Sequence, residues 1–175
     1  MKAMRMAPLA FVVSLAMAPS LAAAQEWKPY NFDECHCSAQ FPGTPQVRTT
    51  PVRTNLGNLD AKMATLEVPE GFYAIMFVDY PKDRPTKSTP DDILTGVREG
   101  QVANVKGKLV SETKITMNGF PGRELRIEAP GDLVLFSRVY LAKERLYQSL
   151  AVTPKKREGS ADVKKFLDSL KFEKP

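Results

Sequence analysis

Two stretches of this chain are apolar at nearly every position, although each has only the length of a β-strand. Residues 72–80 read FYAIMFVDY, and residues 133–142 read LVLFSRVYLA. Successive side chains of a strand point to opposite faces of its sheet, so both stretches need other parts of the protein to cover them on both sides. The sequence therefore predicts a sheet that holds these strands in its interior and carries packed elements on each face.

Two helix signals provide elements that can supply this cover. Thr89 is a good N-cap, Pro90 suits the first helical position and Asp92 can close a capping box, which predicts a helix to about residue 105. Near the C-terminus, Ser160 precedes a second predicted helix with one apolar face. The apolar residues of that face are Val163, Phe166, Leu167 and Leu170. We expect one helix on each face of the sheet.

Turn residues divide the rest of the chain into further strands. Asn118-Gly119 is the strongest of these signals, because this dipeptide favours the two-residue turn of a β-hairpin. Strands are predicted at residues 46–55, 59–68, 109–117 and 145–153, together with a return strand that ends at about residue 129. The whole pattern predicts an α+β fold, with a central antiparallel sheet of about six to seven strands flanked by helices as an α/β/α sandwich. Residues 25–175 contain no repeat and no linker, and are predicted to form a single domain.

The first predicted helix contains two glycines, Gly96 and Gly100, four residues apart. Each weakens a helix by about 1 kcal/mol relative to alanine. A compensating gain is expected, and close approach of the helix backbone to the sheet would provide it. The glycines are therefore predicted to have a packing role rather than to form a ligand-binding loop.

Residues 1–24 have the pattern of an export signal. Lys2 and Arg5 give a positive start, residues 7–17 are almost entirely apolar, and Ala22-Ala23-Ala24 offers a cleavage site before Gln25. The apolar run is shorter than the roughly 20 residues that a membrane-spanning helix needs, and no second run of that length follows. The sequence predicts a cleaved signal peptide and a periplasmic or secreted product that does not span a membrane.

The charge of the chain argues against nucleic acid as a partner. The full chain has 25 basic and 20 acidic residues, a net charge of +5. Loss of Lys2 and Arg5 with the signal leaves 23 minus 20, or +3. Nucleic-acid binding requires a clustered basic face, and so mild an excess does not predict one. Lys155-Lys156-Arg157 is interpreted as a solvated turn, with contact to an anionic membrane surface as the alternative.

The order of elements and several local motifs resemble the PsbP-like fold, which is named for the extrinsic subunit of the photosynthetic oxygen-evolving complex. The resemblance covers most of residues 30–172 and includes a helix after the third strand. Its motifs are FPGTP at residues 41–45, NGFPGRE at 118–124, RLYQSLAV at 145–152 and KFLDSLKF at 165–172. It implies an antiparallel sheet flanked by helices, and a mostly non-catalytic protein that binds other proteins. Many exported bacterial members have no assigned role, and the resemblance implies no site residue.

The triplet Cys35-His36-Cys37 holds both cysteines and the only histidine of the chain. In an extended strand the two cysteines would share one face, about 6.6 Å apart, which is near the upper limit for a disulfide. His36 would then point to the other face, so the three side chains could not bind one metal ion. A loop or bulge would make both a disulfide and a metal site feasible.

Four interpretations of this triplet therefore stay open. The cysteines are structural or idle thiols that include a local disulfide, or they form an intermolecular disulfide or a redox-responsive pair. Alternatively, a metal ion is the protein's cofactor. Its ligands would then be Cys35, His36 and Cys37, with help from Asp33 or Glu34. Nucleophilic catalysis is the least favoured, because the only available base is the immediate neighbour of each cysteine.

Phe120 and Arg123 form a second candidate site, because an exposed arginine beside an aromatic ring is typical of protein interfaces. Asp91-Asp92 are explained by helix capping, and no phosphate-binding loop or nucleophile elbow is present. The sequence thus predicts no catalytic residue and favours a non-enzymatic binding module, whose partner is another envelope or secreted protein. The alternatives are a metal- or thiol-responsive protein acting through the triplet, and a hydrolase whose site the sequence does not reveal.

Overall fold

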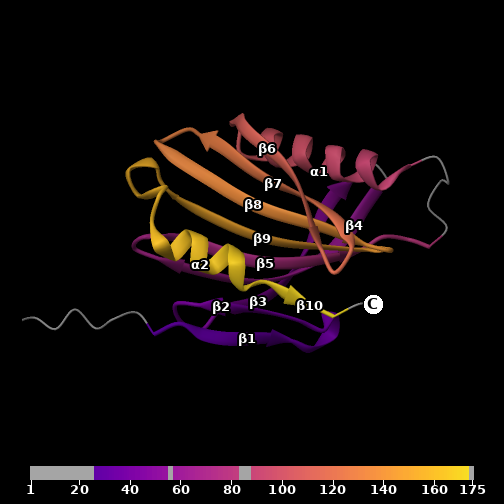
Figure 1. Cartoon of the computed structure of the whole chain (residues 1–175), viewed down its shortest axis with the longest axis horizontal. Helices are drawn as coiled ribbons and strands as arrows, with labels where there is room; N and C mark the ends of the chain where they lie inside the picture. Colours follow the sequence, from indigo (N-terminus) through magenta and orange to yellow (C-terminus); the bar gives the residue numbers. More distant parts are fainter. Residues whose placement is uncertain (1–25, 55–56, 83–87, 174–175) are drawn as a thin grey trace, which may run out of the picture.

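A seven-stranded antiparallel sheet forms the centre of the part of the chain that the computed structural model describes, which is residues 26–54, 57–82 and 88–173. Its strand order is β3-β4-β5-β9-β8-β7-β6 (Figure 1). The strands are β3 (Gln46–Thr54), β4 (Gly57–Val68), β5 (Gly71–Asp79), β6 (Lys108–Met117), β7 (Phe120–Ala129), β8 (Leu133–Ala142) and β9 (Arg145–Pro154). The two apolar stretches are β5 and β8, and both lie in the interior of the sheet on either side of β9. The α+β class and the central antiparallel sheet are confirmed.

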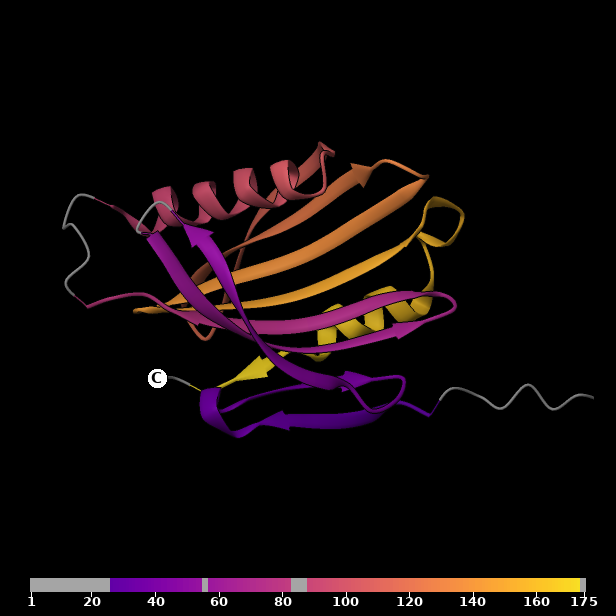
Figure 2. The same cartoon turned by 180° about the vertical axis from the view of Figure 1, so that it is seen from behind.

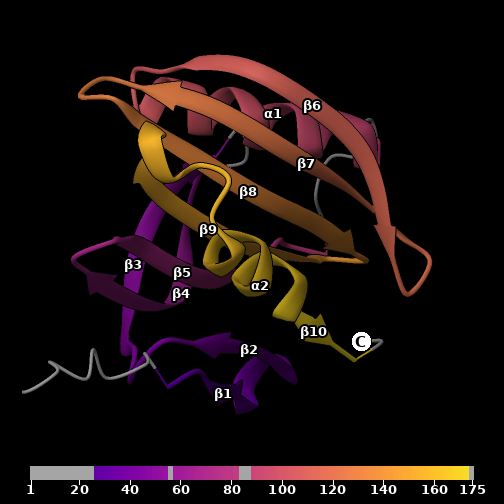
Figure 3. The same cartoon turned by 60° about the vertical axis from the view of Figure 1, so that its left-hand side comes forward.

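The two α-helices pack on opposite faces of this sheet. Helix α1 (Pro90–Asn104) buries Ile93 and Leu94 against one set of side chains of β5, β8 and β9, which includes Val78. Helix α2 (Ala161–Ser169) buries Phe166 against the set that points the other way, which includes Tyr73. Figure 3 shows α1 behind the strands and α2 in front of β9. The alternation of side chains along β5 therefore supplies both cores.

A small second sheet shares the α2 face of the large sheet. It consists of β1 (Lys28–Phe32), β2 (Cys37–Phe41) and β10 (Lys171–Phe172), in the order β1-β2-β10. Phe32, Phe41 and Phe172 of this sheet are buried in the same cluster as Phe166. One helix alone was expected on this face, but α2 and the small sheet cover it together.

Both helices begin where the sequence predicts. At α1 the Thr89 hydroxyl accepts a hydrogen bond from the Asp92 amide at 3.2 Å, and the Asp92 carboxylate accepts one from the Thr89 amide at 2.8 Å. The capping box is thus confirmed. Ser160 occupies the N-cap position of α2, although its side chain makes no capping hydrogen bond.

The predicted export signal, residues 1–24, lies outside the described residues. Within residues 26–54, 57–82 and 88–173, neither helix has both the length and the apolar character needed to cross a membrane.

Candidate functional site

The segment that carries the triplet is a tight turn between β1 and β2. Asp33–Cys35 form a single turn of 3-10 helix, η1, which ends at His36 in the left-handed backbone region, with φ of 48°. The His36 amide donates to the Asp33 carbonyl at 3.2 Å. Few residues other than glycine adopt this conformation, and histidine is among those that do so more often. The turn excludes the extended-strand geometry for residues 33–36.

This turn brings the two cysteines close enough to form a disulfide. Their Cα atoms are 5.2 Å apart, which is within the usual range of about 4.4–6.8 Å, and Cys35 is bonded to Cys37. In this oxidised state neither sulfur is a thiolate, which is the form that binds metals. The His36 side chain is exposed while both cysteines are buried, so the three side chains do not converge.

Within the described residues, no group of three or more histidine, cysteine, aspartate or glutamate side chains is placed to hold a metal ion. A metal site at Cys35, His36 and Cys37 therefore stays a prediction, and it concerns the reduced protein.

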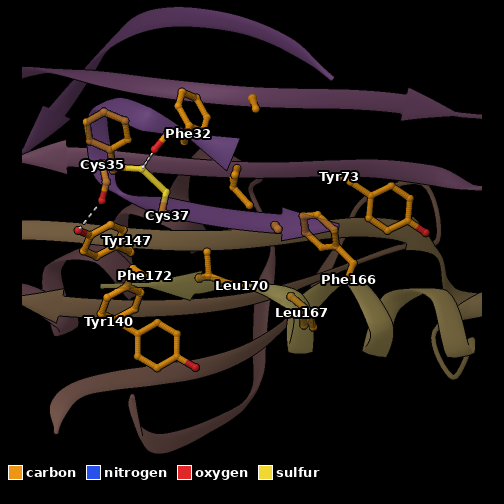
Figure 4. Packing of buried hydrophobic residues seen from close by; sticks show 14 of the residues in the cluster. Phe32, Cys35, Cys37, Tyr73, Tyr140, Tyr147, Phe166, Leu167, Leu170 and Phe172 are labelled. Atoms are coloured by element: carbon orange, nitrogen blue, oxygen red, sulfur yellow. Dashed lines mark hydrogen bonds between the residues drawn. A yellow bond between two sulfur atoms is a disulfide. The ribbon is translucent and has the colours of Figure 1, made fainter. Parts of the chain in front are cut away.

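The disulfide packs into an aromatic cluster between the small sheet and the large one (Figure 4). Cys35 is 1% exposed and Cys37 is 7% exposed. The Tyr147 hydroxyl donates to the Cys35 carbonyl at 3.1 Å, and the Tyr147 ring stacks on Phe172 with centroids 4.2 Å apart. Burial raises the pKa of Tyr147, and the nearby Arg145 partly offsets this rise.

Arg145 fixes the turn from its outer side. The guanidinium donates to the Glu34 carbonyl at 3.1 Å and to both oxygens of Asp79, at 2.5 and 2.8 Å. It also lies 4.9 Å from the centre of the Phe77 ring, which is a cation–π distance. The hydrogen bond with Asp79 raises the pKa of Arg145. The backbone of η1 is thus attached to β5 and β9.

Beside the turn lies a wide hollow of about 650 Å³, which we call the disulfide hollow. Its floor is formed by buried apolar side chains and its rim by polar ones. The floor residues are Phe32, Cys37 and Phe172, and the rim residues are Asn31, Asp33, His36, Ser38, Lys171 and Glu173. The sequence pattern did not point to this hollow.

The two sides of the disulfide hollow are joined by backbone contacts. The Glu173 amide donates to the His36 carbonyl at 3.1 Å, next to the β2–β10 ladder. On the far side of β10, the Asn118 side-chain amide donates to the Phe172 carbonyl at 2.7 Å. The end of the described chain is therefore held against the disulfide turn.

The second predicted site does not form as expected. Phe120 and Arg123 differ by an odd number of positions on β7, so their side chains lie on opposite faces of the sheet. Phe120 is partly buried near Phe172, with ring centroids 6.5 Å apart. Arg123 is only 4% exposed. The prediction that Arg123 is an exposed arginine beside an aromatic ring is wrong, because α1 and β6 cover it.

Arg123 instead belongs to an ion-pair group in which its own guanidinium is the buried member. Its Nε donates to Glu112 at 2.9 Å, and its guanidinium also pairs with Asp91 at the start of α1. Arg98 donates to the second oxygen of Glu112 at 2.9 Å. The hydrogen bond from Arg123, together with one from Lys114, lowers the pKa of Asp91. This group joins α1 to β6 and β7, which is a structural role.

Comparisons with known proteins support the fold. No protein-family profile matches the sequence, and no curated protein matches it. Among solved structures, the chain is similar to cyanobacterial PsbP (CyanoP) from Synechocystis sp. PCC 6803, with a TM-score of 0.58 and 11% identity over 91% of this chain and 99% of that one. A protein of unknown function from Pseudomonas aeruginosa aligns at a TM-score of 0.38 and 12% identity, over 79% of this chain and 86% of that one. The similarity to cyanobacterial PsbP shows that the chain has a PsbP-like fold.

Proposed function

We propose that this protein is an exported, non-catalytic binding module that holds another envelope or secreted protein at the disulfide hollow. The observation that carries the proposal is the construction of the hollow, with an apolar floor, a polar rim and a covalently closed turn at its edge. Protein interfaces combine a desolvated apolar centre with a polar rim in the same way.

The disulfide turn makes the hollow a preorganised surface. Binding costs free energy when loops and side chains must become ordered. Here the Cys35–Cys37 bond, the Arg145 contact with Glu34 and the His36–Glu173 backbone contact restrict the rim before any partner arrives. A wide hollow of this kind suits a side chain or a loop of another protein better than a small metabolite, which requires a deeper pocket.

The edges of the large sheet are less suitable for a partner. Added strands need a regular exposed edge, but β3 carries Pro51 and β6 contains a bulge between Leu109 and Ser111. The bulge leaves Val110 at 46% exposure without extending the ladder. These features favour the hollow over strand addition as the binding mode.

The disulfide also supports export. Disulfides persist in oxidising compartments outside the cytosol, in agreement with the signal pattern of residues 1–24. The thiol- or metal-responsive alternative has less support, because exchange requires an accessible sulfur and both sulfurs belong to buried residues. Intact mass with and without reductant, combined with metal analysis, separates the two: a protein that is reduced and metal-loaded as isolated would favour the alternative.

Charge reversal on the rim tests the proposal. The double variant Asp33→Lys and Glu173→Lys changes two exposed rim residues, and Asp60→Lys with Glu67→Lys makes the same charge change at exposed positions of β4. Affinity-tagged versions are exported and their partners are recovered from the envelope fraction. We expect the wild type and the β4 control to recover the same partner. The rim variant should recover at least about tenfold less of it, because like charges across an interface cost several kcal/mol. Equal recovery with both variants, or no specific partner at all, would refute the proposal.

A further inference from the structure

The face of the sheet opposite the disulfide hollow carries a second concavity, between α1 and the end of β3. It has a volume of about 320 Å³ and is more enclosed than the disulfide hollow. Its floor is the α1-side surface of β5 and β9, where Val78 and Leu146 are buried. One wall is α1 and the other is β3, and Figure 2 shows the end of β3 reaching toward α1. We call this concavity the α1–β3 groove.

The two helix glycines lie in the wall of this groove and do not have the expected packing role. A Cβ atom added to Gly96 or Gly100 would meet nothing within 4 Å, so neither glycine permits a close approach to the sheet. Neither has a positive φ that would demand glycine. The prediction of close backbone packing is therefore wrong. What the glycines provide is space beside α1.

Two glutamine side chains are among the polar residues that line this groove. Both amide atoms of Gln101 are buried and have no hydrogen-bond partner within the described residues. Gln148 is 3% exposed, and its Nε2 donates to the Ser137 hydroxyl at 3.1 Å. A buried amide without a partner costs free energy, and such groups are normally satisfied by protein, water or ligand. Because both atoms are closed off from solvent, an occupant of the groove would reach them only after the Gln101 side chain rotates toward it.

The charge at the mouth favours an anion. Arg53 of β3 lines the groove, is exposed, and forms no ion pair with the described residues. The nearby Glu99 also lines the groove, but its charge is offset by an ion pair with Arg98. The Nη2 atom of Arg98 lies 3.0 Å from Oε1 of Glu99. The uncompensated charge beside the groove is therefore the guanidinium of Arg53, a group that recognises carboxylates.

We propose that the α1–β3 groove binds a small carboxylic acid with an apolar body. The body lies on Met76, Val78 and Leu146, and the carboxylate pairs with Arg53. A volume of about 320 Å³ is near the lower end of the range for ligand pockets, which suits a ligand of about ten non-hydrogen atoms. The site lies on the opposite face from the disulfide hollow, so this inference does not rest on the protein-binding proposal.

Octanoate is a suitable probe, and octanol provides the same apolar body without the charge. Titration of the isotope-labelled wild-type protein, followed by amide chemical shifts, is expected to move the signals of Gly96, Gly100 and Gln148. Octanoate should bind about tenfold more tightly than octanol, and Arg53→Gln should remove that difference. Shifts confined to other regions, or equal affinity for the two probes, would overturn the proposal.

Blocking the groove gives a test with a matched control on the same helix. Gly100→Leu adds a side chain to the groove wall where there is open space, whereas Ala103→Leu adds one at an exposed position outside the groove. Octanoate affinity should fall tenfold or more with Gly100→Leu and stay unchanged with Ala103→Leu, with both variants folded by circular dichroism. Unchanged affinity with Gly100→Leu would contradict binding in the groove. The shift mapping on the wild type decides the question if this variant does not fold.

Discussion

At the scale of single residues, Arg123 is the most deeply buried charged side chain of the ion-pair group. Its side chain is 5% exposed, whereas those of its partners Glu112 and Asp91 are 23% and 60% exposed. Arg123→Ala would leave Glu112 with Arg98 alone and would open a space beneath α1. We expect a loss of about 2 kcal/mol in the free energy of unfolding, measured by urea denaturation.

Arg123→Met is the control, because it keeps most of the side-chain volume without the charge. It should cost less than Arg123→Ala, since replacing a buried ion by an apolar group of similar size is often tolerated. A change below about 0.5 kcal/mol for Arg123→Ala, as at ordinary surface positions, would contradict the structural role.

The sequence does not reveal how a buried charge is paired. Arg123 lies on the same face of β7 as the buried Leu125 and Ile127, but its partners Asp91 and Glu112 come from other elements, and only the tertiary fold places them beside it. For the cysteines, the sequence left a local disulfide as one of several open interpretations of the triplet. It left the geometry open, since the turn at His36 depends on a left-handed backbone conformation that no local motif marks.

At the scale of elements, the capping box of α1 makes stability depend on pH. The hydrogen bonds from Thr89 lower the pKa of Asp92 below its ordinary value. A carboxylate whose pKa is lower in the folded state stabilises the fold above its unfolded pKa of about 4, and this contribution is lost as the pH falls through the folded pKa. Asp92→Asn retains a hydrogen-bond acceptor but cannot titrate.

We therefore expect Asp92→Asn to lose less stability than the wild type when the pH is lowered from 7 to 3, as measured by urea unfolding at each pH. Asp60→Asn, at an exposed position of β4 outside the cap, is the matched control. A pH dependence of Asp92→Asn equal to that of the wild type would show that the cap does not contribute.

Long elements with a clear period were predictable, and short ones were not. The strands and helices between residues 46 and 169 follow apolar patterns and turn signals that act locally. Strands β1 and β2 have five residues each and β10 has two, so their patterns are too short to recognise. The pairing of β10 with β2 joins the two ends of the described chain, and only the tertiary fold specifies it. The disulfide hollow depends on that pairing, which is why the sequence did not indicate it.

At the scale of the whole molecule, the disulfide is expected to matter more for binding than for folding. Its ring encloses only Cys35, His36 and Cys37, and closing so short a loop removes about 1.5 kcal/mol of unfolded-state entropy. The contacts from Arg145, Tyr147 and Glu173 would still hold the turn after its loss. Cys35→Ala with Cys37→Ala should thus lower the free energy of unfolding by about 1–3 kcal/mol and leave the protein folded.

Recovery of the envelope partner by this double cysteine variant should fall further than the stability loss explains, because the rim around His36 would lose one of the restraints that order it before a partner binds. Reductant added to the wild type should reproduce the effect of the substitutions. Full partner recovery by a folded, disulfide-free variant would show that preorganisation of the rim is not needed.

The central claim is that another exported protein occupies the disulfide hollow, and site-specific photo-cross-linking in cells that export the protein tests it most directly. A photoreactive residue placed at Asn31 or Ser38 lies in the lining of the hollow, and one placed at Arg48 lies on the exposed part of β3. The account predicts one partner protein cross-linked from both hollow positions and absent from the Arg48 probe. The same cross-linked proteins from all three positions, or none from the hollow, would contradict it.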